Sequence, residues 1–480
     1  MADLLHVVPE MVLAAGMVLV LLAGFWKLSW TRIWWLAFLV LVADLLFSAD
    51  FFYPEPQTIF SGMLRVSSFA AVIRMLLIVS GLLTMLLAWI VPTERRASEY
   101  YFLLLAMVWG GQWLTLSNHF VSMLVSFEIL SITGYLLVNF GFDQRSAEGS
   151  LKYFLFGAAA TALMIYGASM LYGLTGTLDF ASSRMAEQLA DADRNLTLIA
   201  GLALMAGFLF KIAAAPFHFW APDVYESLPW PMLALFSTVP KFAGLAALLK
   251  VLLSLHAFGL SPVNWTIALG AVATLTLIAG NFAALWQQDT RRLMAWSSVA
   301  QSGFMLISLA SLSATTGRFL VFYMAAFAAG NFLTVHGLAL LEKRTGSGRI
   351  DAYAGQGMGS VWSSVALTLG LISLTGLPPV VGFTAKLFLF AGLWEIWQQS
   401  GAGVHLILFV FGLLNTVVAL FFYLKVPYQL FLKPVSGAII SARDDAGSNL
   451  FRIILVVWVL WAFFQPGLLM GWLNNLNFDL

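Results

Sequence analysis

Cysteine is absent from this 480-residue chain, and charged residues make up only 10% of it. Without cysteine the chain cannot hold a disulfide, a thiolate-bound iron–sulfur cluster or a covalently attached haem. Its six histidines are scattered singly and no metal or nucleotide motif is present, so we expect no cofactor in this chain. A net charge of +1 gives no reason to expect a nucleic-acid partner. The first residues lack lysine and arginine, so we expect no signal peptide.

Apolar residues dominate what remains. They make up 61% of the chain, with a mean hydropathy of +0.90, which is typical of a polytopic helical membrane protein. Runs of about 17 to 25 apolar residues are long enough to cross a bilayer. The sequence therefore predicts an all-α fold with about fourteen spans, near residues 11–26, 33–49, 69–91, 100–116, 119–140, 153–174, 196–220, 230–254, 264–286, 293–312, 318–341, 361–398, 404–428 and 453–470.

The chain contains no linker, and we expect one membrane domain with both termini outside the cell. Basic loop residues set the orientation because they collect on the cytoplasmic side. One side collects Lys27, Arg32, Arg95, Arg96, Arg145, Lys152, Arg291, Arg292, Lys343, Arg344, Arg349, Lys433, Arg443 and Arg452. The other side has only Arg65, Arg184, Arg194 and Arg318. On the second, outer side, the loop 175–195 predicts a short amphipathic helix.

Two apolar runs carry a lysine near the middle and a proline beside it, Lys211 with Pro216 and Lys241 with Pro240. A charge at the bilayer centre costs about 3 kcal/mol, so such a group normally faces protein or water and marks an ion path. A proline frees backbone groups that only protein or trapped water can satisfy there. We favour a transporter interior, the alternative being lysines that reach the interface and ordinary kinks.

The twelfth span predicts a second interruption, at Thr375-Gly376-Leu377-Pro378-Pro379, with Lys386 shortly beyond it. An offset of five spans reverses membrane direction, so we predict an inverted repeat of spans 4–8 and 9–13 with broken helices in spans 7 and 12. The expected segments are an N-terminal three-helix segment (1–98), a first five-helix repeat (99–256), an inverted second repeat (262–430) and a C-terminal helix (450–480).

Further side chains qualify for proton chemistry. Glu128 is the only acid inside the fifth span, and Lys211 is its expected partner; the alternative is a fixed structural salt bridge. His218 follows Lys211 by two turns, which predicts the same helix face and a proton relay, although it is about equally well explained as a packing residue. His336 leaves the same choice open. For Lys250, His256, Asp44, Arg74 and Lys425 we expect interfacial positions.

Five sequence blocks point to a family. KIAAAPFHFWAPDVYESLPWP resembles the antiporter-like, proton-translocating subunits of respiratory complex I (NADH–quinone oxidoreductase), most closely the subunit N branch with its mitochondrial counterpart, subunit 2. The blocks SFEILSITGYLLVNF, RSAEGSLKYFLFGAAATALMIYG, NFAALWQQDTRRLMAWSSVAQSGF and LTGLPPVVGFTAKLFLF agree, in family order. Together they cover most of residues 120–395.

The resemblance implies a charged line along the membrane midplane, with Glu128 and Lys211 as a pair, Lys241 at the centre and Lys386 at the end. His218 matches a family histidine. Redox chemistry in other subunits, which hold NADH, FMN, iron–sulfur clusters and quinone, would drive protons through it. The implied partners are the other complex I membrane subunits, including antiporter-like neighbours, and lipid, in a bacterial inner membrane with periplasmic termini.

One departure concerns Gln301, where the family usually has histidine. Because glutamine does not titrate, a proton path here would need hydrated side chains. Such departures leave room for a divergent or paralogous complex. The alternatives are a subunit of a multi-subunit Na⁺/H⁺ antiporter or membrane-bound hydrogenase, or an assembly scaffold that moves no ions.

Overall fold

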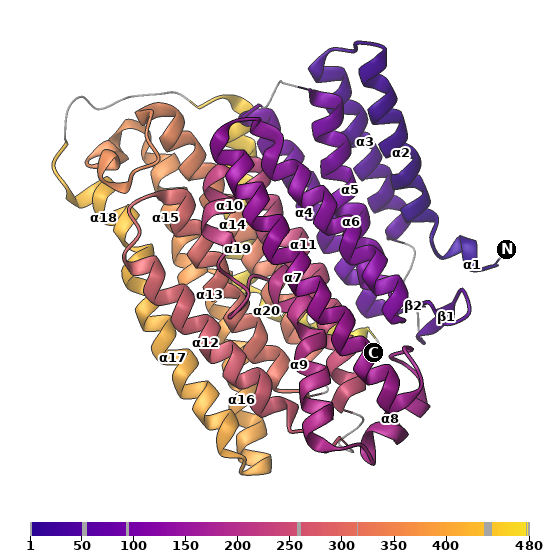
Figure 1. The fold of residues 1–480 in the computed structure, drawn as a ribbon. Coiled ribbons are helices and arrows are strands. Elements are labelled where there is room, and N and C mark those ends of the chain that lie inside the picture. Colours follow the sequence, from indigo (N-terminus) through magenta and orange to yellow (C-terminus); the bar gives the residue numbers. More distant parts are fainter. Residues whose placement is uncertain are drawn as a thin grey trace.

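The described residues form a helical bundle with one small hairpin (Figure 1). The computed structural model describes residues 2–49, 55–92, 96–256, 261–313, 315–435, 444–476 and 478; Arg95 and Arg443, counted above, lie outside them. The helices are α1 (Ala2–Leu5), α2 (Val8–Phe25), α3 (Trp30–Ser48), α4 (Ser68–Ile90), α5 (Ala97–Leu116), α6 (Phe120–Val138), α7 (Gln144–Thr175), α8 (Ser183–Ala190), α9 (Arg194–Lys211), α10 (Ala221–Ser227), α11 (Trp230–His256), α12 (Trp265–Leu285), α13 (Thr290–Ala310), α14 (Thr316–Thr345), α15 (Val361–Thr375), α16 (Val381–Ser400), α17 (Gly403–Tyr423), α18 (Lys425–Leu432), α19 (Ala446–Phe464) and α20 (Pro466–Asn475).

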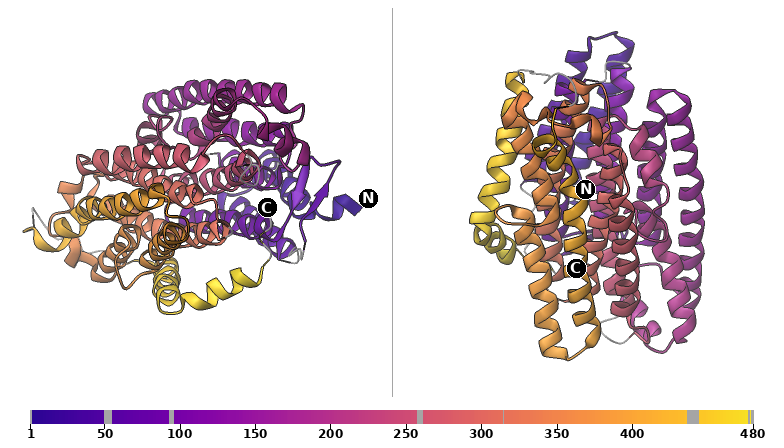
Figure 2. Two further views of the ribbon diagram at one scale, coloured as in Figure 1. Left: turned by 90° about the horizontal axis from the view of Figure 1, so that it is seen from below. Right: turned by 90° about the vertical axis from the view of Figure 1, so that its left-hand side faces the viewer.

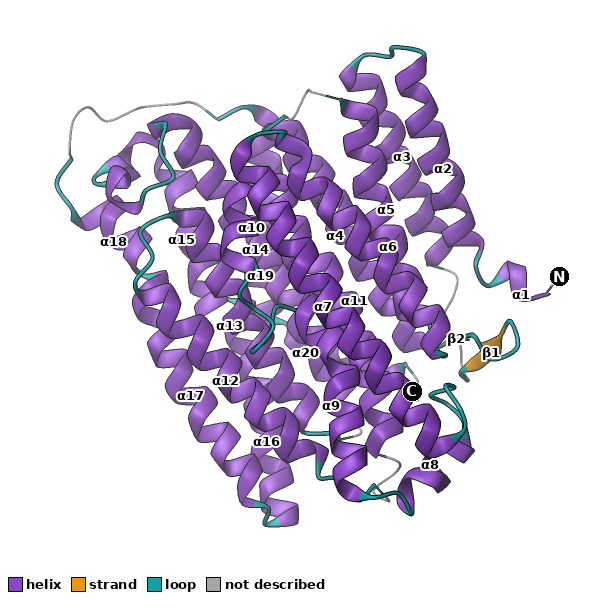
Figure 3. Cartoon of the chain, viewed as in Figure 1, coloured by secondary structure: helices purple, strands orange, loops and turns teal. Residues whose placement is uncertain are grey.

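Short elements connect them. In the described part of the chain, three 3₁₀ helices are Asn139–Gly141, Ile350–Tyr353 and Gln356–Ser360. Strands β1 (Gln57–Ile59) and β2 (Leu64–Val66) pair antiparallel (Figure 3).

Thirteen helices in the described residues are long and apolar enough to cross a membrane, judged by length and composition. The chain is therefore a multi-pass helical membrane protein. Every predicted span contains a helix, but α5, at the predicted span 100–116, is not one of the thirteen. The predicted amphipathic helix of the loop 175–195 is α8, which buries Met185 and Leu189, four residues apart on one face.

Helices α11, α13 and α14 form the centre of the bundle. The most apolar window is entirely buried in α11 and 94% buried in both α13 and α14, against 33–39% in α2, α3, α7, α17 and α19. Seen from below, the N-terminal helices lie at one edge and the orange helices at the other (Figure 2). Polar side chains on the three central helices are thus shielded from lipid by protein.

The first helix and the last described residue lie at the same end of the bundle. The amide of Phe60, next to β1, donates to the carboxylate of Asp3 over 2.9 Å. The ring of Phe478 packs 5.6 Å from that of Phe69, at the start of α4. The N-terminal segment and the last described residue therefore both adjoin the start of α4.

Two turn regions share one hydrogen-bond pattern. In each region, the turn after a helix pairs with a turn farther along the chain. The residues of the second region have numbers 170 higher than their counterparts in the first, as for Phe120 and Thr290. The bonds run from Phe120 N to Leu178 O (2.9 Å), Phe180 N to Asn118 O (3.1 Å), Thr290 N to Gly348 O (2.9 Å) and Ile350 N to Gln288 O (2.9 Å).

Candidate functional site

Lys211 is the last residue of α9 and is 1% exposed. The helix stops because Ala213 has φ 55°, a left-handed conformation that a helix cannot continue. Carbonyl groups freed at the end are bonded by protein: Leu209 accepts from the amide of Ala214 (2.8 Å) and Phe210 from the indole of Trp220 (3.2 Å). A helix end inside the bundle is thereby satisfied without lipid contact.

The side chain of Lys211 reaches α6. Its Nζ donates a 2.8 Å hydrogen bond to Ser131 Oγ, three residues after Glu128 on the same helix face. Glu128 is half-buried, accepts a 3.2 Å hydrogen bond from Thr161 of α7, and lies within electrostatic range of Lys211. The structure thus places the two predicted partners near each other, with Ser131 as the direct contact of the lysine.

Lys241 lies inside α11, beside Pro240, and is 1% exposed. Its Nζ donates to the Ser298 carbonyl (2.8 Å) and to Ser302 Oγ (3.0 Å), both on α13. Ser302 in turn donates to the carbonyl of Ile212, directly after Lys211. One hydroxyl therefore connects the central lysine to the end of α9.

The second interruption separates α15 from α16. Gly376 ends α15 with φ +86°, and a Cβ there would lie 2.6 Å from Cδ of Lys386, so both backbone angle and space require glycine. Lys386 Nζ donates to the carbonyl of Thr375 (2.8 Å), the last residue of α15, and lies 3.9 Å from the centre of the Phe304 ring. The lysine folds back from α16 onto the end of α15.

Gln301 bonds the carbonyl of the residue before Thr375 in α15. Its Nε2 donates to Leu374 O (2.8 Å) and to the hydroxyl of Tyr423 (3.1 Å), and its Oε1 accepts from the hydroxyl of Tyr323 (2.7 Å). The amide is 3% exposed. It therefore links α13, α14, α15 and α17 by direct contacts.

A small cavity lies beside Gln301. It measures about 10 Å³, close to the least that holds one water molecule, and its lining includes Tyr323, Ser373 and Lys386. Ser373 Oγ is buried and makes no hydrogen bond to the described protein atoms. The site is polar enough for a single water between Gln301 and Lys386.

His218 lies in the turn between α9 and α10. The prediction that it shares a helix face with Lys211 is wrong, because α9 has already ended. The ring is 6% exposed, packs 5.7 Å from that of Trp296, and its Nδ1 makes no hydrogen bond to the described protein atoms.

His336 lies on α14, thirteen residues and about 20 Å beyond Tyr323 along the axis. Its Nε2 is 2.9 Å from the hydroxyl of Ser448, in the first turn of α19. Just before α19, Asp444 bonds Arg344 and Arg452. The structure therefore separates His336 from Gln301 and Lys386 and places it beside an ion cluster.

A second ion cluster involves α10. Asp223 accepts hydrogen bonds from Lys152 (2.7 Å) and Arg292 (3.1 Å), and Arg292 also bonds Glu226 (2.6 Å). Burial opposes ionisation of Asp223, but these two cations outweigh it and hold the pKa of the carboxyl below its usual range.

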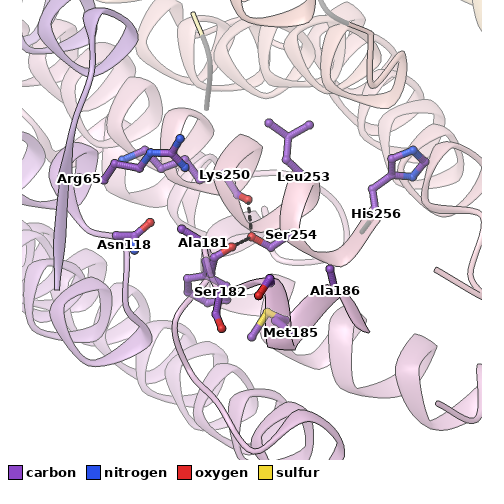
Figure 4. Close-up of a pocket in the computed structure, with 12 residues that line it drawn as sticks. Arg65, Asn118, Ala181, Ser182, Met185, Ala186, Lys250, Leu253, Ser254 and His256 are labelled. Carbon is purple, nitrogen blue, oxygen red and sulfur yellow. Dashed lines mark hydrogen bonds between the residues drawn. The ribbon is translucent and has the colours of Figure 1, made fainter. Parts of the chain in front are cut away.

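Lys250 was predicted to extend to the interface, and its side chain bonds a helix end. It is 7% exposed, and its Nζ donates to the carbonyls of Thr115 and Ser117 (3.3 Å to the latter), at the end of α5. A cavity of about 330 Å³ adjoins it, lined by Arg65, His256 and the start of α8 (Figure 4). Lysine at a helix C-terminus satisfies the last carbonyls.

Lys425 makes a similar contact farther along the chain. Its Nζ donates to the carbonyls of Leu285 and Gln287 (3.4 Å to the latter), at the end of α12. Both acceptors lie 170 residues after those of Lys250.

Asp44 and Arg74 were also predicted at the interface, and both lie toward helix ends, but their side chains are enclosed by protein. They are 0% and 1% exposed, inside the group formed by α2 to α5. Sequence reasoning also missed the polar contacts of the lysines, of which Ser298 and Ser302 were visible as serines within the apolar tenth span. Within the described residues, no three His, Asp or Glu side chains cluster as a metal site would require.

Comparison with known proteins identifies the family. The model of the NADH:quinone oxidoreductase/Mrp antiporter transmembrane family matches residues 117–413. NADH-quinone oxidoreductase subunit N 2 of Chloroherpeton thalassium is 34% identical over 82% of this chain and 79% of its own length. NAD(P)H-quinone oxidoreductase subunit 2 of Synechocystis is 35% identical over 78% and 71%.

Solved structures agree. A chain of respiratory complex I from Thermus thermophilus is similar over 96% of this chain and 98% of its own, with 28% identity and a TM-score of 0.80. A chain of the archaeal membrane-bound sulfane sulfur reductase has a TM-score of 0.86 at 21% identity, covering 98% and 96%, which shows the shared fold. By fold and by sequence, the chain belongs to the NADH:quinone oxidoreductase/Mrp antiporter transmembrane family.

Proposed function

We propose that this chain is the subunit-N-type membrane subunit of a proton-pumping NADH:quinone oxidoreductase and that it moves protons through buried Glu and Lys side chains. Its relatives are named as subunits of NADH-quinone oxidoreductase and respiratory complex I, which supports membership of such a complex. The other membrane subunits, including antiporter-like ones, are the partners. Redox chemistry in those partner proteins drives the protons, and this chain has no redox centre of its own.

One observation carries the mechanism: a single helix, α13, connects two buried lysines to two helix ends. Lys241 bonds Ser302, which bonds the carbonyl after α9. The next residue, Gln301, bonds the end of α15, where Lys386 is also bonded. The water-sized cavity lies between Gln301 and Lys386. The proposed order is Glu128, Lys211, Lys241, the Gln301 contacts and Lys386.

The two histidines have side roles in this proposal. His218, with its unpartnered ring nitrogen near the end of α9, is a candidate relay to Lys211. His336 is a candidate entry point beside the Asp444 cluster. Asn331, five residues before His336 on α14, donates to Ser237 over 2.7 Å, and Ser237 lies one turn before Lys241 on α11.

An inverted repeat belongs to the proposal. It relates spans 4–8 (within 99–256) to spans 9–13 (within 262–430), beside an N-terminal segment (1–98) and a C-terminal helix (450–480), with broken helices in spans 7 and 12. Matching turn contacts at an offset of 170 residues support it. So do the equivalent caps formed by Lys250 and Lys425.

The proposed location is a bacterial inner membrane with both termini in the periplasm. The surplus of basic loop residues on the side opposite the termini supports this orientation.

The test is Lys241→Ala in the assembled complex, with exposed Lys433→Ala as the control. We expect normal assembly, with proton uptake and NADH-driven quinone reduction reduced at least about tenfold, the rate equivalent of about 1.4 kcal/mol. Wild-type pumping at matched assembly would contradict the role of Lys241. Recovery of the chain with antiporter subunits and no NADH-oxidising arm would instead favour the Na⁺/H⁺ antiporter alternative.

A further inference from the structure

Four buried polar side chains meet among helices α2 to α5, away from the lysine line. Glu10, Asp44, Arg74 and Gln112 come one each from α2, α3, α4 and α5, and each is at most 1% exposed. Each lies within about 10 Å of a helix end, on the side of the bundle where the chain termini lie.

Direct bonds form two pairs. Arg74 Nη2 donates to Glu10 Oε2 over 2.9 Å, and Gln112 Nε2 donates to Asp44 Oδ2 over 2.7 Å. The second oxygen of each carboxyl group, Glu10 Oε1 and Asp44 Oδ1, is buried and makes no hydrogen bond to the described protein atoms. Helix α3 packs against α2, α4 and α5, and among the described residues the charged and hydrogen-bonding groups that face Asp44 from them are Glu10, Arg74 and Gln112.

The charges of these groups do not balance. Arg74 neutralises one carboxylate, and Glu10 already bonds it. An ionised Asp44 would then be an uncompensated charge, and burying one costs several kcal/mol. Binding one proton removes that charge.

Gln112 suits both protonation states of its partner. A side-chain amide offers NH groups to a carboxylate and a carbonyl oxygen to a carboxylic acid. Its own Oε1 is buried without a donor among the described protein atoms. Rotating the amide would let it accept from a protonated Asp44.

We propose that Glu10, Asp44, Arg74 and Gln112 form a second ionisable site, in which one proton is bound for two carboxyl groups and one guanidinium, and Asp44 carries it. The site is independent of the lysine line and of the proposed function. Its ligand is a proton taken up from the side of the bundle where the chain termini lie.

The test is infrared spectroscopy of the intact complex, following the carbonyl stretch of a protonated carboxylic acid. At neutral pH, Asp44→Asn should remove one such band, and Asp191→Asn, at an exposed loop position, should not. Glu10→Gln should also remove it, because Asp44 then ionises against Arg74. The double variant Glu10→Gln/Arg74→Gln should restore the band, because Asp44 is left without a cation.

Three results would overturn the proposal. An unchanged spectrum in Asp44→Asn means that Asp44 is ionised in the wild type. A band that survives Glu10→Gln means that the protonation of Asp44 does not depend on the charge of Glu10. Loss of the band on replacing potassium by sodium at constant pH would make the ligand a metal cation. Recovery of each variant in the complex, measured by co-purification, separates these outcomes from misfolding.

Discussion

Gln301 and Ser302 are neighbours in α13, yet their side chains bond carbonyl groups at the ends of two different helices. Ser302 donates to Ile212 O, just after α9, and Gln301 donates to Leu374 O of α15 over 2.8 Å. Consecutive helix residues point about 100° apart, so one helix set between two interruptions serves both. A shift of α13 would disturb both helix ends together, which gives a physical basis for coupling between Lys241 and Lys386.

Gln301 should tolerate histidine and not leucine. Leucine removes the side-chain donor to Leu374 O, the acceptor of the Tyr323 hydroxyl and one of the two partners of the Tyr423 hydroxyl, which keeps Ser297. It also removes one polar group from the lining of the neighbouring cavity. Histidine keeps a donor and an acceptor. We expect proton uptake in reconstituted complex to fall about tenfold in Gln301→Leu, equivalent to about 1.4 kcal/mol, and to change little in Gln301→His. Normal pumping by the leucine variant at matched assembly would show that the path avoids this residue.

Lys386 and Lys425 should respond differently to truncation. Both bond helix-terminal carbonyls, but only Lys386 adjoins Gln301 and the water-sized cavity. We expect Lys386→Ala to reduce pumping about tenfold, and Lys425→Ala to lower thermal stability while pumping per assembled complex is kept.

Lys386→Arg separates a proton carrier from a structural cap. Arginine can still donate to Thr375 O but does not lose its proton. Pumping restored by arginine would reduce Lys386 to a cap, and equal pumping losses in Lys386→Ala and Lys425→Ala would show that the two lysines have the same role.

Apolar runs predicted the helices well because a membrane span requires a long apolar segment whatever it packs against. Interior lysines were found for the same reason: a charge inside such a run is conspicuous. Burial was harder to predict. Lys250, Asp44 and Arg74 were judged by distance from the ends of their runs, whereas their burial depends on the neighbouring helices α2 to α5.

The hydrogen-bond partners of the buried lysines could not be predicted from the sequence. Nothing in the sequence shows that Lys211 bonds Ser131 or that Lys386 folds back onto Thr375, because both contacts depend on how helices cross. The face of His218 was misjudged because a helix was extended past Lys211, and Ala213, a residue with good helix propensity, gave no sign of a left-handed turn there.

Ionised Asp444 should stabilise the folded protein, so that stability falls at acidic pH. Burial opposes its ionisation, but hydrogen bonds from Ser363 and Arg452 and the charge of Arg344 outweigh it and lower its pKa. A lowered carboxyl pKa stabilises the folded protein at pH values above the usual carboxyl pKa. That stability is lost as the pH falls through the lowered pKa, below about 4. Asp444→Asn should cost about 3 kcal/mol near neutral pH, because Arg344 and Arg452, both largely shielded from water, lose the carboxylate that they share.

Thermal unfolding of the complex between about pH 6 and pH 3 is the measurement. The variant should lose less stability than the wild type across this range, and Asp191→Asn should behave as wild type. Parallel curves for Asp444→Asn and the wild type would mean that Asp444 does not contribute.

Glu128 and Lys211 should be energetically coupled although Ser131 and Thr161 are their direct contacts. Each lies within the electrostatic range of the other, and in a low-dielectric interior such a charge affects whether its neighbour keeps a proton. Removing Glu128 leaves Lys211 without its acidic neighbour, which favours the neutral amine. We expect Glu128→Gln to slow proton uptake about tenfold and Glu128→Asp to be milder, while Glu395→Gln, at an exposed position, has no effect.

The double variant Glu128→Gln/Lys211→Ala decides the question. If the two groups act as one unit, it should pump no worse than the slower single variant, because the second change removes nothing that still functions. Ser131→Ala should show a weaker effect, since it removes the hydrogen bond and leaves the charge of Glu128 in place. Barrier increases that add strictly, measured as proton uptake at matched assembly, would mean that Glu128 and Lys211 act separately.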